Sequence, residues 1–160
     1  MKPLALALVL AAMLVPTAAF AVPQRGEPAP VLNLPAATGS PVSTAALRGK
    51  PVYLSFFATW CGPCNDEAPA LEAVAEKYRA AGLVVVGVDE QESRARAQAF
   101  ANKYGLTYPI ALDTSGSVGD ELGIDATPTN IFIDRAGNVS SVHVGEMTPA
   151  AIEAAVKGLL

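Results

Sequence analysis

The sequence predicts an α/β domain with a mixed central sheet and helices on both of its faces. Two near-continuous apolar runs, residues 52–57 and 83–88, are typical of strands that are covered on both sides. The segment between them has apolar residues at helical spacing, so we expect two parallel strands joined by a crossover helix. Residues 130–133 and 139–144 flank an Asp-Arg-Ala-Gly-Asn turn, which predicts a terminal hairpin and hence an antiparallel pair.

The elements before the first long strand are short. Residues 22–30 are rich in proline, glycine and charge and are predicted to be a linker. Residues 31–34 form a predicted edge strand, and residues 36–41 contain Gly39 and Pro41 and are predicted to turn. Ser43 is expected to cap a short helical turn over residues 44–47. The predicted domain therefore covers residues 31–160.

Helix-capping residues and helix-terminating glycines predict the later elements. Cys61 opens a helix that ends at Gly82, and Ser93 caps a helix that ends at Gly105. Thr148 and Pro149 begin a last helix that runs to about residue 159. Shorter segments are a strand at residues 110–112, a helical turn within residues 116–123, and a solvated loop at residues 89–92.

Composition excludes several classes of protein. The chain has 160 residues, of which 51% are hydrophobic and 16% charged, so it is neither disordered nor collagen-like. The net charge of −4 lacks the basic footprint of a nucleic-acid-binding protein. Two cysteines are too few for a disulfide-stapled scaffold.

Residues 1–21 have the layout of a secretory signal peptide. Lys2 precedes an apolar run at residues 4–15, Pro16 ends that run, and Ala19-Phe20-Ala21 supplies a small-residue cleavage site. The run is shorter than the ~20 residues that a membrane span needs. An uncleaved membrane anchor is the alternative. Export would place the chain where thiols tend to be oxidised.

Cys61 and Cys64 carry the predicted chemistry. A thiol at a helix N-terminus meets free N–H groups and the helix dipole, which lower its pKa and favour the thiolate. Cys64 lies one turn further on, where it can attack a mixed disulfide formed by Cys61. A structural disulfide this local would stabilise the fold little, and a zinc site needs about four ligands. The chain has no other cysteine and one histidine, His143.

Residues 60–64 (Trp-Cys-Gly-Pro-Cys) resemble the active site of the thioredoxin superfamily. The resemblance covers nearly the whole chain after residue 21 and points to exported TlpA/ResA-like thiol–disulfide oxidoreductases. It includes the signal peptide and an N-terminal β-hairpin extension. The stretches that carry it are residues 64–69 (Cys-Asn-Asp-Glu-Ala-Pro), 86–89, 104–109 and 127–134.

The resemblance assigns roles to individual residues. It implies that Pro128 is cis and faces the two sulfur atoms, which leaves the backbone of Thr127 free to pair with an extended substrate. Trp60 is expected to lie beside Cys61 and shape the docking surface. Gly62 and Pro63 set the turn between the cysteines.

The resemblance favours Glu67 as the residue that exchanges protons with Cys64. It lies one helical turn after Cys64, so the two side chains share a face of the helix. A partly buried carboxylate there can exchange protons with the thiol. Thioredoxin carries a buried aspartate six residues before its first cysteine, and here that position is Ser55. A first-turn acid favoured by the helix dipole is the alternative for Glu67.

The resemblance implies reduction of disulfides in extracytoplasmic proteins, with cytochrome c maturation and copper-site assembly as candidate settings. The Gly62-Pro63 dipeptide and Thr129 differ from many cytochrome-maturation members, so the substrate is left open. No soluble cofactor or metal is expected, because the cysteines carry the two electrons. A membrane electron-transfer partner would re-reduce the protein, which we expect to be a monomer. The alternatives are a net disulfide-forming oxidase and a copper chaperone that uses the two cysteines and His143.

Overall fold

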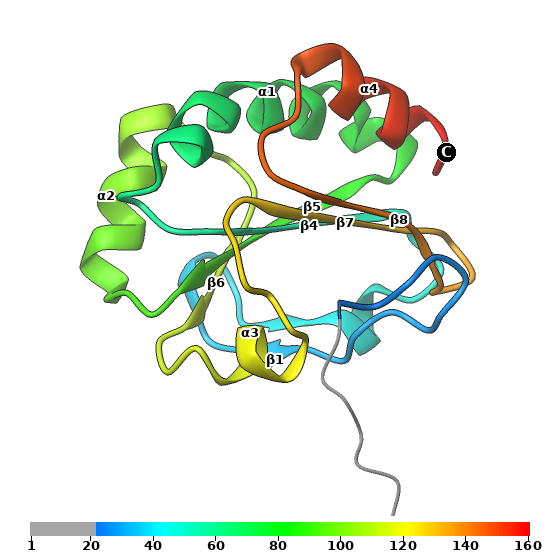
Figure 1. Ribbon diagram of the computed structural model, residues 1–160. Helices are drawn as coiled ribbons and strands as arrows, with labels where there is room; N and C mark the ends of the chain where they lie inside the picture. The colour runs from blue at the N-terminus through cyan, green and yellow to red at the C-terminus, as the bar shows by residue number, and fades with distance from the viewer. Residues whose placement is uncertain (1–21) are drawn as a thin grey trace, which may run out of the picture.

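A six-stranded mixed sheet organises the computed structural model, which describes residues 22–160 (Figure 1). The predicted signal peptide lies outside the described residues. The strands are β1 (Asn33–Leu34), β2 (Ala36–Thr38), β3 (Val42–Ser43), β4 (Val52–Phe57), β5 (Val84–Glu90), β6 (Ile110–Asp113), β7 (Thr129–Ile133) and β8 (Val139–Val144). The helices are η1 (Thr44–Leu47), α1 (Gly62–Tyr78), η2 (Arg79–Ala81), α2 (Arg94–Tyr104), α3 (Ser117–Glu121) and α4 (Pro149–Lys157).

The strand order is β2-β6-β5-β4-β7-β8, which confirms the predicted mixed sheet. Strands β4, β5 and β6 are parallel, while β7 and β8 form the predicted antiparallel hairpin against β4. Parallel crossovers that advance in one direction place their helices on the same face. Accordingly α1 and α2, together with α4, cover one face of the sheet (Figure 1).

The opposite face has a thinner cover. Its core consists of alternate strand residues such as Leu54, Val86 and Val88, which pack beneath Leu32 and Val42 of the N-terminal segment. The short helix α3 and η1 complete this layer. Helices therefore lie on both faces, as predicted, but the three long ones share one face, and a small antiparallel sheet of β1 and β3 covers part of the other.

The N-terminal region contains two strands that the residue pattern does not predict, β2 and β3, of which β3 pairs with β1. Residues 36–38, predicted to turn, form the edge strand β2, which pairs antiparallel with β6. Two side chains of α2 hold this strand: Arg94 donates to the carbonyl of Ala36, and Gln98 donates to the carbonyl of Ala37 at 3.0 Å. Ser43 precedes η1 as predicted but makes no side-chain cap bond.

The start of the described chain is attached to the β7–β8 turn. The N–H of Gly26 donates to the carbonyl of Val139 at 2.8 Å, and the N–H of Ala29 donates to the carbonyl of Gly137 at 2.9 Å. Within residues 22–160, no helix is both long and apolar enough to cross a membrane.

Candidate active site

The two cysteines lie where β4 gives way to α1. Cys61 is the N-cap of α1, and the backbone N–H of Cys64 donates to its Sγ at 3.2 Å. Pro63 occupies the first turn, where a missing N–H costs no helical hydrogen bond. The pair is joined as a disulfide with an S–S distance of 2.13 Å. The predicted geometry of a thiol at a helix N-terminus is therefore present.

Cys61 borders an open groove. Trp60, Gly62 and Pro63 line one side of it, and residues 124–127 line the other. The Trp60 side chain is 73% exposed, so it contributes surface and not core. The Thr127–Pro128 peptide bond is cis, as the resemblance implied, and the carbonyl oxygen of Thr127 lies 3.5 Å from Cys61 Sγ. In the reduced protein the thiol can donate a hydrogen bond to that carbonyl.

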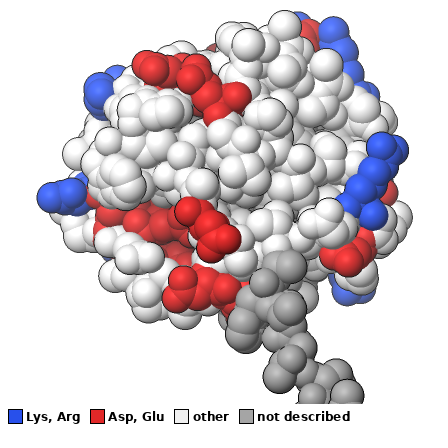
Figure 2. Space-filling view, viewed as in Figure 1, with Lys and Arg blue, Asp and Glu red and all other residues white. Residues whose placement is uncertain are grey.

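Carboxylates lie along the groove and behind it. Glu90 and Asp125 line it, and Asp113 and Asp120 lie close enough to Glu90 to act on its charge. Burial, followed by these two carboxylates, raises the pKa of Glu90 to about 7. Figure 2 shows acidic side chains gathered on this face of the molecule, with Lys and Arg mainly toward its margins.

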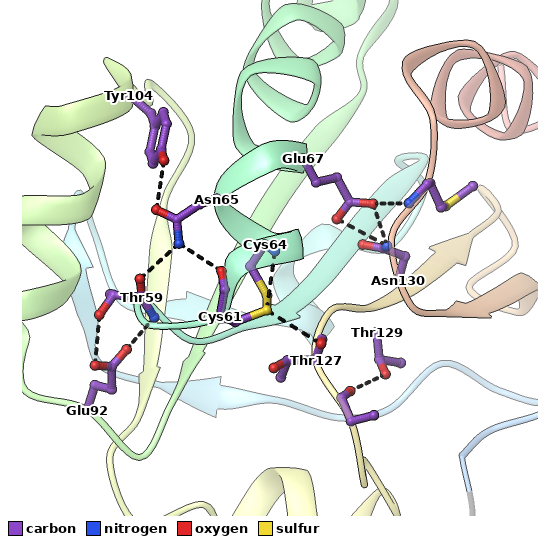
Figure 3. Close-up of a disulfide and its surroundings, with 12 residues drawn as sticks. Thr59, Cys61, Cys64, Asn65, Glu67, Glu92, Tyr104, Thr127, Thr129 and Asn130 are labelled. Carbon is purple, nitrogen blue, oxygen red and sulfur yellow. Dashed lines mark hydrogen bonds between the residues drawn. A yellow bond between two sulfur atoms is a disulfide. The ribbon is translucent and has the colours of Figure 1, made fainter.

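Two side chains hold the loop before Cys61 (Figure 3). Glu92 accepts hydrogen bonds from the backbone N–H of Thr59 at 2.5 Å and from its hydroxyl at 2.8 Å. Asn65 donates to the carbonyls of Thr59 and Cys61, at 2.9 and 2.7 Å, and accepts from the Tyr104 hydroxyl at 2.7 Å. The loop geometry at Cys61 is thus fixed by both α1 and the segment before α2.

The prediction of a solvated loop at residues 89–92 is wrong. Asp89 is buried because it lies in β5 between Phe57 of β4 and Leu112 of β6. Glu92 is buried after Gln91, whose left-handed backbone conformation (φ 58°) ends the strand, and it bonds to Thr59. Neither carboxylate oxygen of Asp89 has a hydrogen-bond partner among residues 22–160. Burial and then the charges of Glu92 and Glu90 raise the pKa of Asp89 to about 7.

Cys64 borders a small internal cavity on the α1 face of the sheet. Glu67 lines the same cavity, together with Ser55, Tyr108 and apolar side chains of the core. The Glu67 side chain is 3% exposed. Its Oε1 accepts from the backbone N–H of Met147 at 2.9 Å and from Asn130 Nδ2 at 3.0 Å (Figure 3).

Burial has the largest effect on Glu67. It raises the pKa of this carboxyl to about 7, against the lowering effect of the hydrogen bonds from Met147 and Asn130. A carboxyl with this pKa changes its charge near neutral pH. It can therefore accept or release a proton next to Cys64 under ordinary conditions.

Sequence patterns alone did not single out the polar neighbours of the site. The apolar pattern places Asn130 in a strand and gives it no role, and it assigns no site role to Tyr53, Asn65, Thr59 or Glu92. One signal was available: an amide inside the apolar run of β7 needs a buried hydrogen-bond partner. His143 lies exposed on β8, and no group of three His, Cys, Asp or Glu side chains among the described residues is placed to hold a metal ion.

The comparisons with known proteins agree with this geometry. The profile of the Redoxin family matches residues 24–159. The thiol-disulfide oxidoreductase ResA of Bacillus thuringiensis (strain Al Hakam) is 32% identical over 134 residues, which cover 84% of this chain and 78% of ResA. A thiol:disulfide interchange protein of the thioredoxin family from Chlorobium tepidum TLS superposes with a TM-score of 0.76 at 32% identity, covering 84% of this chain and 97% of that one.

A third similarity is to a secreted Mycobacterium tuberculosis disulfide oxidoreductase homologous to Escherichia coli DsbE. Its TM-score is 0.74 at 26% identity, with 80% of this chain and 96% of that chain covered. The chain belongs to the Redoxin family, within the thioredoxin superfamily. It is a thioredoxin-like thiol–disulfide oxidoreductase of the ResA type.

Proposed function

We propose that this oxidoreductase is exported and reduces disulfides in extracytoplasmic proteins through Cys61 and Cys64. The signal-peptide layout of residues 1–21 and the similarity to a secreted oxidoreductase support export. Glu67, buried beside Cys64 with a pKa near 7, is the single observation that carries the proposed mechanism.

The first step is attack by the Cys61 thiolate on a substrate disulfide. One substrate sulfur forms a mixed disulfide with Cys61, and the other leaves as a thiolate that takes up a proton. The N-cap position and the Cys64 N–H at 3.2 Å support the anionic sulfur. Cys61 is only 5% exposed in the disulfide form, so a substrate would reach its sulfur through the open groove that it lines.

The second step resolves the mixed disulfide. Cys64 attacks Cys61 Sγ, the substrate leaves with both sulfurs reduced, and Cys61–Cys64 remains as a disulfide. Cys64 must lose its proton to attack, and Glu67 is the nearby group that can accept it. The carboxylate form predominates above about pH 7, so this step speeds up as the pH rises through that value.

Trp60 and Thr127 are the proposed docking residues. The exposed indole supplies an apolar contact beside Cys61. The carbonyl of Thr127, across the groove, can accept a hydrogen bond from the backbone of an extended substrate segment. Gly62 and Pro63 complete the wall of the groove and leave room for the incoming chain.

Two electrons leave the protein in each cycle, so it needs a donor. A membrane electron-transfer partner is the proposed source, and the protein is proposed to act as a monomer with no soluble cofactor. Apocytochrome c and copper-site cysteines are the proposed substrates, since both require reduced thiol pairs outside the cytoplasm.

The midpoint potential of the cysteine pair tests the direction of the reaction. The purified protein is equilibrated in graded dithiothreitol buffers at pH 7, and the oxidised fraction is followed by Trp60 fluorescence and by thiol alkylation. We expect a value of about −270 mV or lower, as for reductants of the thioredoxin type. A value near about −120 mV would reverse the proposal and make the protein an oxidant.

A further inference from the structure

Asn130 is a buried amide in the middle of an otherwise apolar strand. Every position of β7 is buried, and Asn130 itself is 0% exposed. In the sheet it lies opposite Ser55 on β4 and His143 on β8. An amide taken out of water in this way destabilises the fold unless its hydrogen bonds are replaced.

Two buried side chains, Glu67 and Tyr53, supply the hydrogen bonds that the Asn130 amide would otherwise make to water. Asn130 Nδ2 donates to both carboxylate oxygens of Glu67, at 3.0 and 3.3 Å, and Oδ1 accepts from the Tyr53 hydroxyl at 3.0 Å (Figure 3 shows the Glu67 contacts). With Glu67 ionised, the reversed amide would bring Oδ1 against the carboxylate oxygens, and neither group would then donate. The network therefore favours this orientation of the amide while Glu67 carries its charge.

Tyr53 supplies the donor that this orientation uses, and it does so across the working pH range. Its ring is fully buried and stacks on Phe132 with the centroids 4.4 Å apart. Burial and the charge of Glu67 raise the pKa of Tyr53 well above its ordinary value. The hydroxyl thus stays protonated and remains a donor to Asn130.

We infer that Asn130 is a positioning residue, which orients the Glu67 carboxylate at the cavity that it shares with Cys64 and favours its ionised form. Tyr53 holds Asn130 for that task. The inference rests on the proposed role of Glu67 as proton acceptor and adds the groups that set its proton affinity.

Only neutral hydrogen-bond donors stabilise the ionised form of Glu67 within the described residues. Within residues 22–160 no Lys, Arg or His forms an ion pair with Glu67. The ionisable groups that face it are Tyr53 from β4, Tyr108 from the loop before β6, Glu146 from the segment before α4, and Cys64 on its own helix. Glu146 opposes ionisation, so the bonds from Asn130 and Met147 N–H are what favour it.

Direct titration of the carboxyl tests the inference. The reduced protein is labelled with ¹³C at glutamate, and the Glu67 signal, assigned from Glu67→Gln, is followed with pH. Asn130→Leu, which keeps the branched shape of the side chain and removes the donor, is expected to raise the proton affinity of Glu67 by about tenfold or more. Asn102→Leu, at an exposed site on α2, is the matched control and is expected to leave it unchanged.

A second variant covers the case in which Asn130→Leu does not fold. Tyr53→Phe keeps the ring stacked on Phe132 and removes only the hydroxyl, so we expect a smaller rise in the proton affinity of Glu67. An unchanged Glu67 titration in whichever of these variants is folded, judged by thermal unfolding, would overturn the inference.

Kinetics separate this inference from the proposed function. The rate of the resolving step is measured against pH in four proteins: the parent, Glu67→Gln, Asn130→Leu and the double variant. We expect Asn130→Leu to move the profile to higher pH only where Glu67 is present. If the carboxyl titration shifts while Glu67→Gln leaves the rate unchanged, the role of Asn130 stands and the proton-transfer role of Glu67 fails. If the rate depends on Glu67 while the Glu67 titration does not shift, the inference alone fails.

Discussion

The two sulfur atoms of one disulfide lie in different surroundings. Cys61 borders an open groove, where it meets a backbone N–H of the helix N-terminus and the carbonyl of Thr127. Cys64 borders a closed cavity, where its neighbours are Glu67 and the apolar core. The loop before Cys61 is held by Asn65 and Glu92, whereas hydrogen bonds from β7 and from the segment before α4 hold the cavity carboxylate.

This difference assigns different controls to the two steps of one reaction. Backbone dipoles do not titrate, so the attack by Cys61 takes its pH dependence from the thiol and from Glu90, which lines the same groove and changes charge near pH 7. The attack by Cys64 depends on a different carboxyl, Glu67, which lines the internal cavity and also changes charge near pH 7. Variants on the two sides of the disulfide should therefore act on different steps, which can be measured separately.

Exchange of either sulfur should have the largest effect. Cys61→Ser removes the attacking atom, so we expect complete loss of disulfide reduction. Cys64→Ser leaves the first attack intact, so the mixed disulfide with Cys61 should accumulate and be visible as an adduct by mass spectrometry. Accumulation of the adduct in Cys61→Ser, and not in Cys64→Ser, would contradict the assignment of Cys61 as the attacking and Cys64 as the resolving residue.

Glu67→Gln should have the next largest effect, confined to the Cys64 step. We expect the resolving step to slow by about 10²–10⁴ at pH 8, the usual contribution of a positioned base, and much less at pH 6. The reason is that Glu67 is ionised above about pH 7 and protonated below it. Stopped-flow measurement of both steps checks this, with the rate of mixed-disulfide formation as the internal control. A variant that retains the parental pH profile would contradict the assignment.

Asp89→Asn should change the stability of the protein and leave the rate of disulfide reduction unchanged. The pKa of Asp89 is about 7 in the folded chain, above its ordinary value of 3.8, so the unfolded chain loses this proton first as the pH rises. The contribution of Asp89 to the free energy of unfolding is therefore fully present below about pH 4 and is lost between pH 4 and 7. Above pH 7, Asp89→Asn removes a buried, unpaired charge, which should stabilise the folded protein by about 1–3 kcal/mol, or roughly 2–10 °C in Tm.

Thermal unfolding of Asp89→Asn and the parent at pH 4 and pH 8 measures this effect. We expect equal Tm values at pH 4 and a higher Tm for the variant at pH 8. Asp125→Asn, at an exposed acid beside the groove, is the control and should leave Tm unchanged at both values. A higher parental Tm at pH 8 would mean that the Asp89 carboxylate has a partner in solution.

Trp60→Ala should have the smallest effect, limited to docking. Because the side chain is 73% exposed, we expect a change in stability within about 0.5 kcal/mol. The KM for a protein disulfide should rise severalfold, while kcat and the rate with a small disulfide such as oxidised glutathione stay the same. An equal loss with both substrates would place Trp60 in the reaction itself and not in docking.

Local signals in the sequence were enough for the long elements and the sulfur chemistry. The apolar run at residues 52–57 coincides with β4, and the side chains of Ser93 and Thr148 cap α2 and α4 as expected. The Cys-x-x-Cys spacing and the position of Glu67 one turn later depend only on helix geometry. The cis bond before Pro128 came from the family resemblance and not from a local rule.

Long-range contacts account for what was missed. Strand β2 contains Ala-Ala-Thr, a sequence with little strand character, and exists because β6 and two α2 side chains satisfy its backbone. The sequence indicates a surface acid at Glu92, whereas the turn at Gln91 places its carboxylate within hydrogen-bond distance of Thr59. Asn130 and Tyr53 lie 77 residues apart in the chain, so no window of sequence shows their hydrogen bond.

The pairing of residues 26–29 with the β7–β8 turn fixes where the described chain enters the domain. Strand β7 is five residues long, from Thr129 beside Pro128 to Ile133 before that turn, and spans about 17 Å by strand geometry. The described chain thus starts at the end of the sheet opposite the disulfide. An anchor or immobilising tag joined before residue 22 would therefore attach at the end of the sheet away from Cys61 and leave the groove available to partners.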